Sequence, residues 1–440
     1  MPTVSASFPA CRIARFRFRS CRCVGLSAVA GATSRGRVAR IGISGLFGWL
    51  GASTPPPAEQ ARWRAVLAPG VAGVCLGLLF LAAGLAPTGF SPTGPFQVGE
   101  HWGLGEELAA RGVAVATEPG IGYDGQWYLA LAHDPLLLRQ DLTSRFDNPR
   151  YRAGRPLQGW LGWLLAGGRP GAIPLALLAL GPLAVGLGCA ATARILSAFG
   201  RSPAWGFGFA LVPGVWTGVA VATAEPLGLA LAALGLSLAL DRRLGLAGLA
   251  FAGAALTKES YLAFAVAAAL HLLLDRSAAG SARLRAAALA LVPALAGLAG
   301  WWLYLVTRVP VYPDRGWVGV LVPPFTDLPR WLWALGHYQP PTVPDAPGRA
   351  GAMLVAGCLL LIGAGLVVGL LRRSLPARCG LVFGGYFSLL GGVLPTQFFS
   401  TLRLLAPCCF AALLAMASGP TARRRLAVRR AREDERASVG

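Results

Sequence analysis

The chain has 440 residues, of which 55% are hydrophobic and 13% are charged, and its formal net charge is +21. Soluble globular proteins carry about 25% charged residues, so this composition excludes a single soluble domain. The high apolar content also excludes disorder over most of the chain. A mean hydropathy of +0.57 over this length indicates many membrane spans rather than one anchor.

Arginine is concentrated at the two ends of the chain. Residues 1–58 hold eight Arg and no acidic residue, and residues 421–440 hold seven Arg and three acidic residues. A strongly basic chain can be a nucleic-acid-binding protein. Here the cations flank apolar runs, which favours cytoplasmic loops facing anionic lipid and no nucleic-acid partner. We expect 1–60 to be a basic tail without a role in the site, either a cytoplasmic arm or an over-extended gene start, and 421–440 to be a cytoplasmic tail.

From residue 61 to residue 420, apolar runs of about 14–22 residues alternate with polar turns, as expected for an all-α integral membrane domain. A helix needs about 20 apolar residues to cross a bilayer, so most of these runs are candidate spans. We predict ten transmembrane helices, over residues 66–86, 172–193, 203–222, 225–240, 244–257, 259–274, 286–306, 350–371, 379–395 and 402–418.

The arginines between the predicted spans indicate the orientation. Basic residues precede the first span and follow the second, fourth, sixth, eighth and last spans. They are Arg62, Arg64, Arg194, Arg201, Arg242, Arg243, Arg276, Arg283, Arg285, Arg372, Arg373, Arg378 and the group beginning at Arg423. With ten spans they all lie on one side, which the positive-inside rule makes cytoplasmic. The sequence therefore predicts a multi-pass protein of the inner (plasma) membrane with both termini in the cytoplasm.

Two long segments, 87–171 and 307–349, are then expected outside. The first holds eight acidic residues and seven Arg, and it is too long for a simple connector. Its end, 156–168, is apolar, contains two Trp and is predicted to be an interfacial helix because it is too short to span. The second segment is rich in Pro, Trp and Tyr, and the aromatic residues suit the headgroup level.

The most distinctive motif, EPGIGYDGQWY, begins at Glu118 in the first outer segment. It places Asp124 between glycines and next to the aromatic Tyr123, and Asp134 follows ten residues later. A carboxylate in such a loop can take a proton from a hydroxyl nucleophile. The alternative interpretation is an Asp-Gly turn that only shapes the loop.

Cations follow in the same segment. Four arginines lie within eleven residues: Arg145, Arg150, Arg152 and Arg155. Arginine can clamp a phosphate through paired hydrogen bonds, so these residues are candidates for holding one. The alternative is a solvated loop in which Asp141 and Asp147 balance the charge.

Four more ionisable residues lie at predicted outer ends of spans: Glu225, Lys258, Glu259 and Arg403. Charges in apolar segments are costly and therefore suggest function. Lys258 is also the only Lys among the 40 basic residues. The alternatives are an ion pair that caps a helical hairpin at Lys258 and Glu259, and a favourable helix-dipole interaction at Glu225.

Metal or disulfide chemistry is not predicted from the Cys and His residues. The nine Cys contain no CxxC pair, and the four His form no HExxH motif. No cofactor is expected, although carboxylates alone leave room for a divalent cation.

Taken together, these residues resemble the GT-C superfamily of multi-pass glycosyltransferases. GYDGQWYLALAHDP and DNPRYRAGRP are similar to a bacterial GT-C-like family associated with cell-surface glycopolymer formation. The TAEPL element around Glu225 is similar to the Ser-Glu-Pro-Leu motif of PIG-V-type mannosyltransferases. The resemblance covers residues 61–420. One departure is that many members carry paired acids where this chain has Asp124-Gly125, so Glu118 or Asp134 could supply the second acid.

The resemblance implies a polyprenyl-phosphate sugar as donor and an envelope glycan or lipid as acceptor. Asp124 would be the base, with Glu118 and Asp134 as further catalytic candidates. The implied substrate-binding residues are Tyr123, Gln126, Arg150, Arg152, Arg155, Glu225, Lys258, Glu259 and Arg403. A transporter or flippase of a lipid-linked glycan is the alternative function, and a noncatalytic scaffold of a glycan-assembly complex is a third.

Overall fold

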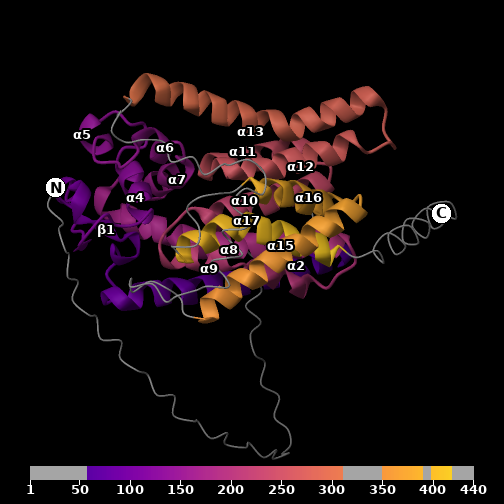
Figure 1. The fold of residues 1–440 in the computed structure, drawn as a ribbon, viewed down its shortest axis with the longest axis horizontal. Coiled ribbons are helices and arrows are strands. Elements are labelled where there is room, and N and C mark those ends of the chain that lie inside the picture. The colour runs from indigo at the N-terminus through magenta and orange to yellow at the C-terminus, as the bar shows by residue number, and fades with distance from the viewer. Residues whose placement is uncertain (1–56, 311–348, 390–397, 419–440) are drawn as a thin grey trace, which may run out of the picture. The chain divides into compact units, whose positions relative to one another are not determined.

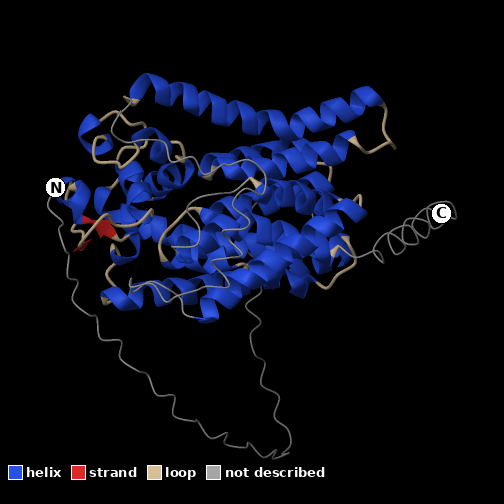
Figure 2. Cartoon of the chain, viewed as in Figure 1, coloured by secondary structure: helices blue, strands red, loops and turns tan. Residues whose placement is uncertain are grey.

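The computed structural model describes residues 57–310, 349–389 and 398–418. The predicted tails 1–60 and 421–440 and the predicted outer segment 307–349 fall almost entirely outside these ranges. The structure is 77% helical, and Figure 2 shows helices throughout with one small pair of strands. The all-α prediction is therefore confirmed.

Five helices contain a stretch that is long and apolar enough to cross a membrane. They are α2 (Pro57–Leu85), α8 (Ile173–Ala198), α13 (Gly280–Arg308), α15 (Arg349–Leu371) and α17 (Phe398–Ala417). Shorter apolar helices are α10 (Glu225–Leu240), α11 (Leu244–Thr257) and η7 (Glu259–Tyr261) with α12 (Leu262–Leu273). Sixteen residues of α-helix extend about 24 Å, less than the hydrocarbon core of about 30 Å. Length thus supports five spans in the described residues, and the count of ten stays a prediction.

The segment 203–222, predicted as one span, does not form one continuous helix. The chain there forms η6 (Pro203–Phe209) and, after a break, α9 (Pro213–Ala220). Pro213 is the first residue of α9. Because proline has no backbone N–H, it cannot donate the hydrogen bond that would continue a helix from η6. The span predicted at 379–395 corresponds in part to α16 (Leu375–Ser388), and its last residues lie outside the described part.

The predicted outer segment 87–171 folds into short elements with a core of their own. These are η2 (Ala86–Thr88), η3 (Gly94–Phe96), β1 (Val98–Gly99), η4 (Glu100–Trp102), α3 (Leu104–Ala109), β2 (Thr117–Glu118), α4 (Gly125–His133), α5 (Gln140–Thr143), α6 (Pro149–Ala153), α7 (Leu157–Leu165) and η5 (Pro170–Ala172). Strands β1 and β2 pair in parallel, with Val98 opposite Thr117. Phe96, Trp127 and Phe146 are buried in this core, and Trp301 of α13 joins them.

The long helices pack through small residues. Helix α2 lies against α8, and a Cβ added at Gly77 would come within 2.5 Å of the Pro182 Cα. Such close backbone approach is typical of helix pairs in membranes, where packing replaces the hydrophobic effect as the driving force. In Figure 1, α13 runs along one edge of the bundle, over α11 and α12, and α4 to α7 lie at one end.

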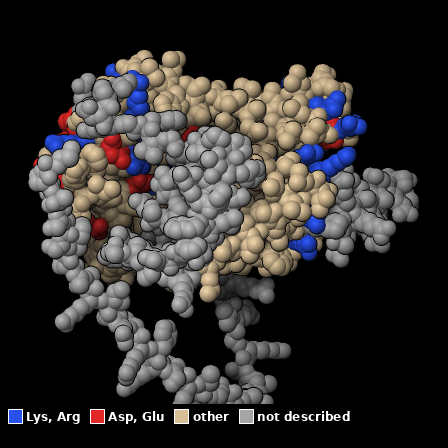
Figure 3. Space-filling model, in the orientation of Figure 1, with Lys and Arg blue, Asp and Glu red and all other residues tan. Residues whose placement is uncertain are grey.

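The basic turns meet at the other end of the bundle, here called the cation-rich end. The interactions that join them are Arg194–Asp241 (2.6 Å), Arg242–Asp275 (2.9 Å), Arg201 Nε to the Ala417 carbonyl (2.8 Å) and Arg372 Nη1 to the Ser418 carbonyl (3.2 Å). Figure 3 shows blue side chains gathered at this end and mixed red and blue at the opposite end. The common position of the basic turns is thus observed, while their cytoplasmic placement stays a prediction.

Candidate functional site

Charged side chains from five separate parts of the chain form a continuous series of ion pairs at the end opposite the cation-rich end. In order they are Asp147, Arg152, Asp124, Arg403, Glu225 and Lys258, here called the charged network. The N···O distances along it are 2.6, 2.7, 2.9, 2.9 and 3.1 Å. Carboxylates and cations alternate, so each internal member touches two partners of opposite charge.

Asp124 lies at the N-cap position of α4 but does not cap the helix. An N-cap Asp normally accepts a hydrogen bond from a backbone N–H in the first turn. Here the Asp124 side chain makes no such bond. Instead Oδ1 accepts from Arg152 at 2.7 Å and Oδ2 accepts from Arg403 at 2.9 Å. The carboxylate therefore bonds to residues distant in the sequence. An Asp-Gly turn that only shaped the loop would not need these bonds.

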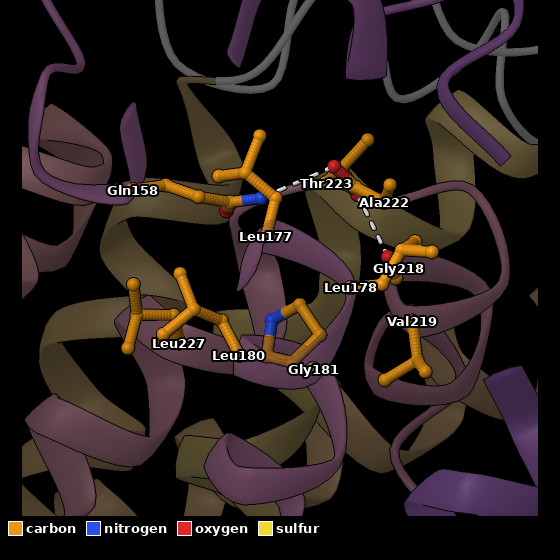
Figure 4. Close-up of a pocket in the computed structure, with 11 residues that line it drawn as sticks. Gln158, Leu177, Leu178, Leu180, Gly181, Gly218, Val219, Ala222, Thr223 and Leu227 are labelled. Carbon is orange, nitrogen blue, oxygen red and sulfur yellow. Dashed lines mark hydrogen bonds between the residues drawn. The ribbon is translucent and has the colours of Figure 1, made fainter. Parts of the chain in front are cut away.

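Glu225 is placed by a tight turn between α9 and α10. Ala222 has a φ of +51°, in the left-handed region that L-residues rarely adopt. Gln158 Nε2 donates to the Ala222 carbonyl at 3.1 Å, and Thr223 Oγ1 donates to the Gly218 carbonyl at 3.5 Å. Figure 4 shows the Gln158 amide reaching this turn from α7. The turn begins α10 at Glu225, whose Oε1 accepts from both Arg403 and Lys258.

Lys258 and Glu259 lie between α11 and η7. Lys258 ends α11 with an extended backbone, φ −164° and ψ 125°, and its amine reaches Glu225. Glu259 instead accepts two bonds from Arg155, at 2.7 and 3.0 Å. The local ion pair considered as the alternative for Lys258 and Glu259 is not formed, because the two residues pair with distant partners.

Aromatic rings flank the cations. The Arg403 guanidinium lies 5.0 Å from the centre of the Tyr123 ring, and the Tyr123 hydroxyl is 3.4 Å from Ser400 Oγ. Arg155 lies 4.3 Å from the centre of the Tyr151 ring and donates to the Tyr151 hydroxyl at 2.7 Å. Contacts of this kind hold a guanidinium in one orientation and partly desolvate it.

Burial differs sharply within the charged network. The Glu225 side chain is 1% exposed, whereas that of Asp124 is 27% exposed. Burial disfavours ionisation of Asp124, but Arg152, Arg403 and Arg155 outweigh it and hold the pKa of that carboxyl well below its usual range. Asp124 is thus an ionised carboxylate with about a quarter of its side-chain surface exposed.

Several predicted site residues have structural contacts elsewhere. Asp134 accepts from the backbone N–H groups of Leu138 and Arg139 and closes the turn after α4. Arg150 Nε donates to the Val309 carbonyl at 2.8 Å and caps the end of α13. Glu118 is an exposed residue of β2, paired with Gly99 through the backbone.

Gln126, predicted to bind substrate, uses its amide to hold the loop before Asp124. Its Oε1 accepts from the Gly99 N–H at 3.1 Å, and its Nε2 donates to the Ile121 carbonyl at 2.9 Å. The side chain is buried. Gln126 therefore positions the Asp124 loop relative to β1.

Sequence reasoning missed three residues of this region as site members: Asp147, Tyr151 and Gln158. Asp147 precedes Arg152 by five residues, a spacing from which the 2.6 Å pair could have been suspected. No local pattern connects Gln158 with the turn at Ala222. Within the described ranges, no group of three or more His, Cys, Asp or Glu side chains is arranged to hold a metal ion.

Two buried atoms of the network, Glu225 Oε2 and Arg403 Nε, have no hydrogen-bond partner among the described residues.

The chain was compared with protein-family models, curated proteins and solved structures, and it matches none of them. Its function is therefore inferred from its residues and their geometry.

Proposed function

We propose that the chain is a membrane glycosyltransferase that moves a sugar from a polyprenyl-phosphate donor to an envelope glycan or lipid acceptor. The reaction takes place at the charged network, on the side of the membrane away from the cation-rich end. The observation that carries the proposal is Asp124: an accessible carboxylate that leaves its own helix uncapped and is held by guanidinium groups 28 and 279 residues away.

Asp124 is the base in this proposal. The acceptor hydroxyl gives its proton to the Asp124 carboxylate as the oxygen attacks the anomeric carbon of the donor sugar. The bond between that carbon and the phosphate oxygen breaks, and the configuration at the carbon inverts. The polyprenyl phosphate leaves with the electron pair of the broken bond.

The arginines explain how one site serves both the base and the leaving group. In the free protein they hold the pKa of Asp124 so low that the carboxylate is a weak base. A donor phosphate that draws hydrogen bonds from Arg152 or Arg403 removes part of this stabilisation, so the pKa of Asp124 rises when the donor is bound. The same guanidinium groups then stabilise the charge that develops on the leaving phosphate.

Helix ends supply the charged groups, which favours a transferase over a transporter. Glu225 begins α10, Lys258 ends α11, and Arg403 lies in the second turn of α17. Transporters place substrate and ion sites near the middle of the bilayer, on broken helices. A site at helix ends and next to a folded outer segment suits a reaction at the membrane surface.

The test is consumption of a polyprenyl-phosphate sugar by membranes that contain wild-type or Asp124→Asn protein. Asn keeps the shape of the side chain and removes its basicity, so transfer should fall by roughly a hundredfold to ten-thousandfold. Asp141→Asn is the matched control, because Asp141 is half exposed and pairs with Arg111 away from the network. Its activity should stay within about twofold of wild type.

Asp134→Asn and Glu118→Gln test the other two acids. If either variant is inactive while Asp124→Asn retains activity, the base has been assigned to the wrong residue. If all three variants transfer sugar normally, a carboxylate base in this segment is excluded, and the transporter and scaffold functions are favoured.

A further inference from the structure

An apolar groove runs along the side of the bundle at the cation-rich end. It has a volume of about 600 Å³, within the range of sites that hold small organic ligands. Its walls come from η6, α15 and α17, and most lining side chains are apolar, including Trp205, Leu211, Leu361 and Met416. Leu211 is 74% exposed and Trp205 60% exposed, which leaves much of the groove open to the surroundings.

One arginine lines this groove, and a second is bonded one residue further along the chain at the end of α17. Arg201 lines it and donates to the Ala417 carbonyl, while Arg372 donates to the carbonyl of the next residue, Ser418. Because their acceptors are consecutive carbonyls, both side chains are anchored at the end of α17. Each uses one described hydrogen bond of the several that a guanidinium can donate.

The rise along α15 from Leu361 in the groove to Arg372 matches one leaflet of a bilayer. Leu361 lies eleven residues before Arg372, a helical rise of about 16 Å. Half of a hydrocarbon core is about 15 Å. Trp205 suits the headgroup level, where tryptophan is enriched in membrane proteins. A molecule that fits has an acyl chain of one leaflet and an anionic head at the guanidinium groups.

We propose that this groove binds one anionic phospholipid from the leaflet at the cation-rich end, with its phosphate on Arg201 and Arg372 and an acyl chain along η6 and α15. The inference does not depend on the proposed transferase activity. It concerns the end of the bundle opposite the charged network.

Native mass spectrometry of the purified full-length chain tests the proposal. The protein is incubated with phosphatidylglycerol or phosphatidylcholine, and bound lipid is counted after detergent exchange. Wild type should retain one phosphatidylglycerol in preference to phosphatidylcholine. Arg201→Gln and Arg372→Gln should each lower that retention about fivefold, the contribution typical of one cation near an anionic lipid surface.

Arg283→Gln is the matched control, because Arg283 also donates to a helix-end carbonyl, that of Leu273, but does not line the groove. It should retain lipid like wild type. Leu361→Trp keeps both arginines and fills the groove, so it should lose retention as well. Glycerol phosphate, which has the head without the chains, should not compete.

Equal retention of both lipids by wild type would overturn the proposal. So would equal loss in Arg283→Gln and Arg201→Gln, or full competition by glycerol phosphate, since each shows general attraction to positive charge without a groove. Melting temperatures of all variants are recorded without lipid. If Arg201→Gln is destabilised, the proposal is judged from lipid retention by Leu361→Trp alone. Retention of phosphatidylglycerol by Leu361→Trp at the wild-type level would then reject the site.

Discussion

Asp124 and Glu225 share Arg403 but differ in what they can do. Glu225 is buried between Arg403 and Lys258, so its carboxylate holds α10, α11 and α17 together. Asp124 has one open side and bonds to side chains from α6 and α17. Removing one member of a buried ion pair leaves the partner charge uncompensated, which costs more than the pair contributes. Both carboxylates are therefore expected to affect stability, and only the more exposed one, Asp124, is expected to take part directly in the proposed reaction.

We expect Asp124→Asn to lower the free energy of unfolding by about 1–3 kcal/mol at neutral pH, since two charged hydrogen bonds are weakened. Because the pKa of Asp124 is depressed in the folded state, its stabilising contribution is present above the unfolded pKa of about 3.9 and is lost only as pH falls through the lower folded value. The difference in melting temperature between wild type and variant should stay constant from pH 8 to pH 5. A difference that fades near pH 6 would contradict the ionised network.

At the scale of elements, the turn between α9 and α10 decides where Glu225 lies. A strained Ala222, a side-chain bond from α7 and the start of α10 occur within four residues. Backbone strain of this kind persists only where surrounding structure over-determines it. The folded segment 87–171 therefore contacts the turn between α9 and α10 directly, through Gln158.

Gln158→Leu should destabilise the protein by about 1–3 kcal/mol, because the buried Ala222 carbonyl loses its side-chain donor. Ala222→Gly should have the opposite sign, a gain of up to about 1 kcal/mol, because glycine adopts this φ without strain. Thermal unfolding in detergent measures both variants. Destabilisation by Ala222→Gly would show that the packing lost with the methyl group outweighs the relief of backbone strain.

Helix α2 provides a second test of element packing. Gly77→Val should destabilise the protein by about 1–3 kcal/mol or more, because the new side chain meets the backbone of α8 at Pro182. Gly300→Val in α13 is the matched control, since a Cβ there has no neighbour within 4 Å. Both variants are compared by folded yield and melting temperature. Equal effects would mean that lost backbone flexibility, and not packing, explains the change.

At the scale of the whole described bundle, charge is divided between two ends. One end carries basic turns tied to helix ends. The other carries the charged network together with the Arg155–Glu259 pair, four cations and four carboxylates in all. Basic residues near helix ends are retained on the cytoplasmic side during insertion. From this rule we expect the charged network to face the outside.

Single cysteines test this orientation. Leu138→Cys, an exposed position after α4, should react in intact cells with a reagent that does not cross membranes. Ala279→Cys, an exposed position between α12 and α13, should react only after the membrane is opened. Labelling of wild type measures the background from native cysteines. The reverse pattern would show the opposite orientation. Labelling of both positions in intact cells would contradict their placement on opposite sides of the membrane.

The sequence by itself determined the helical class, several helix boundaries and most charged members of the site. The predicted ranges 225–240 and 244–257 coincide with α10 and α11, because the charged residues Asp241, Arg242 and Arg243 interrupt two apolar runs. Charges in apolar runs are rare enough to draw attention to Glu225, Lys258 and Arg403 without knowledge of their partners.

Only the tertiary structure determined which charged residues form ion pairs with one another. Lys258 and Glu259 are neighbours in sequence, yet one bonds to Glu225 and the other to Arg155, and Arg403 meets Asp124 across 279 residues. The tertiary structure also showed that Arg150 and Arg152 have different roles. Arg150 caps α13, whereas Arg152 holds Asp124. Local patterns report which residues are costly to bury, whereas partners at such separations are chosen by helix packing, where a rotation of one helix would exchange every contact along its face.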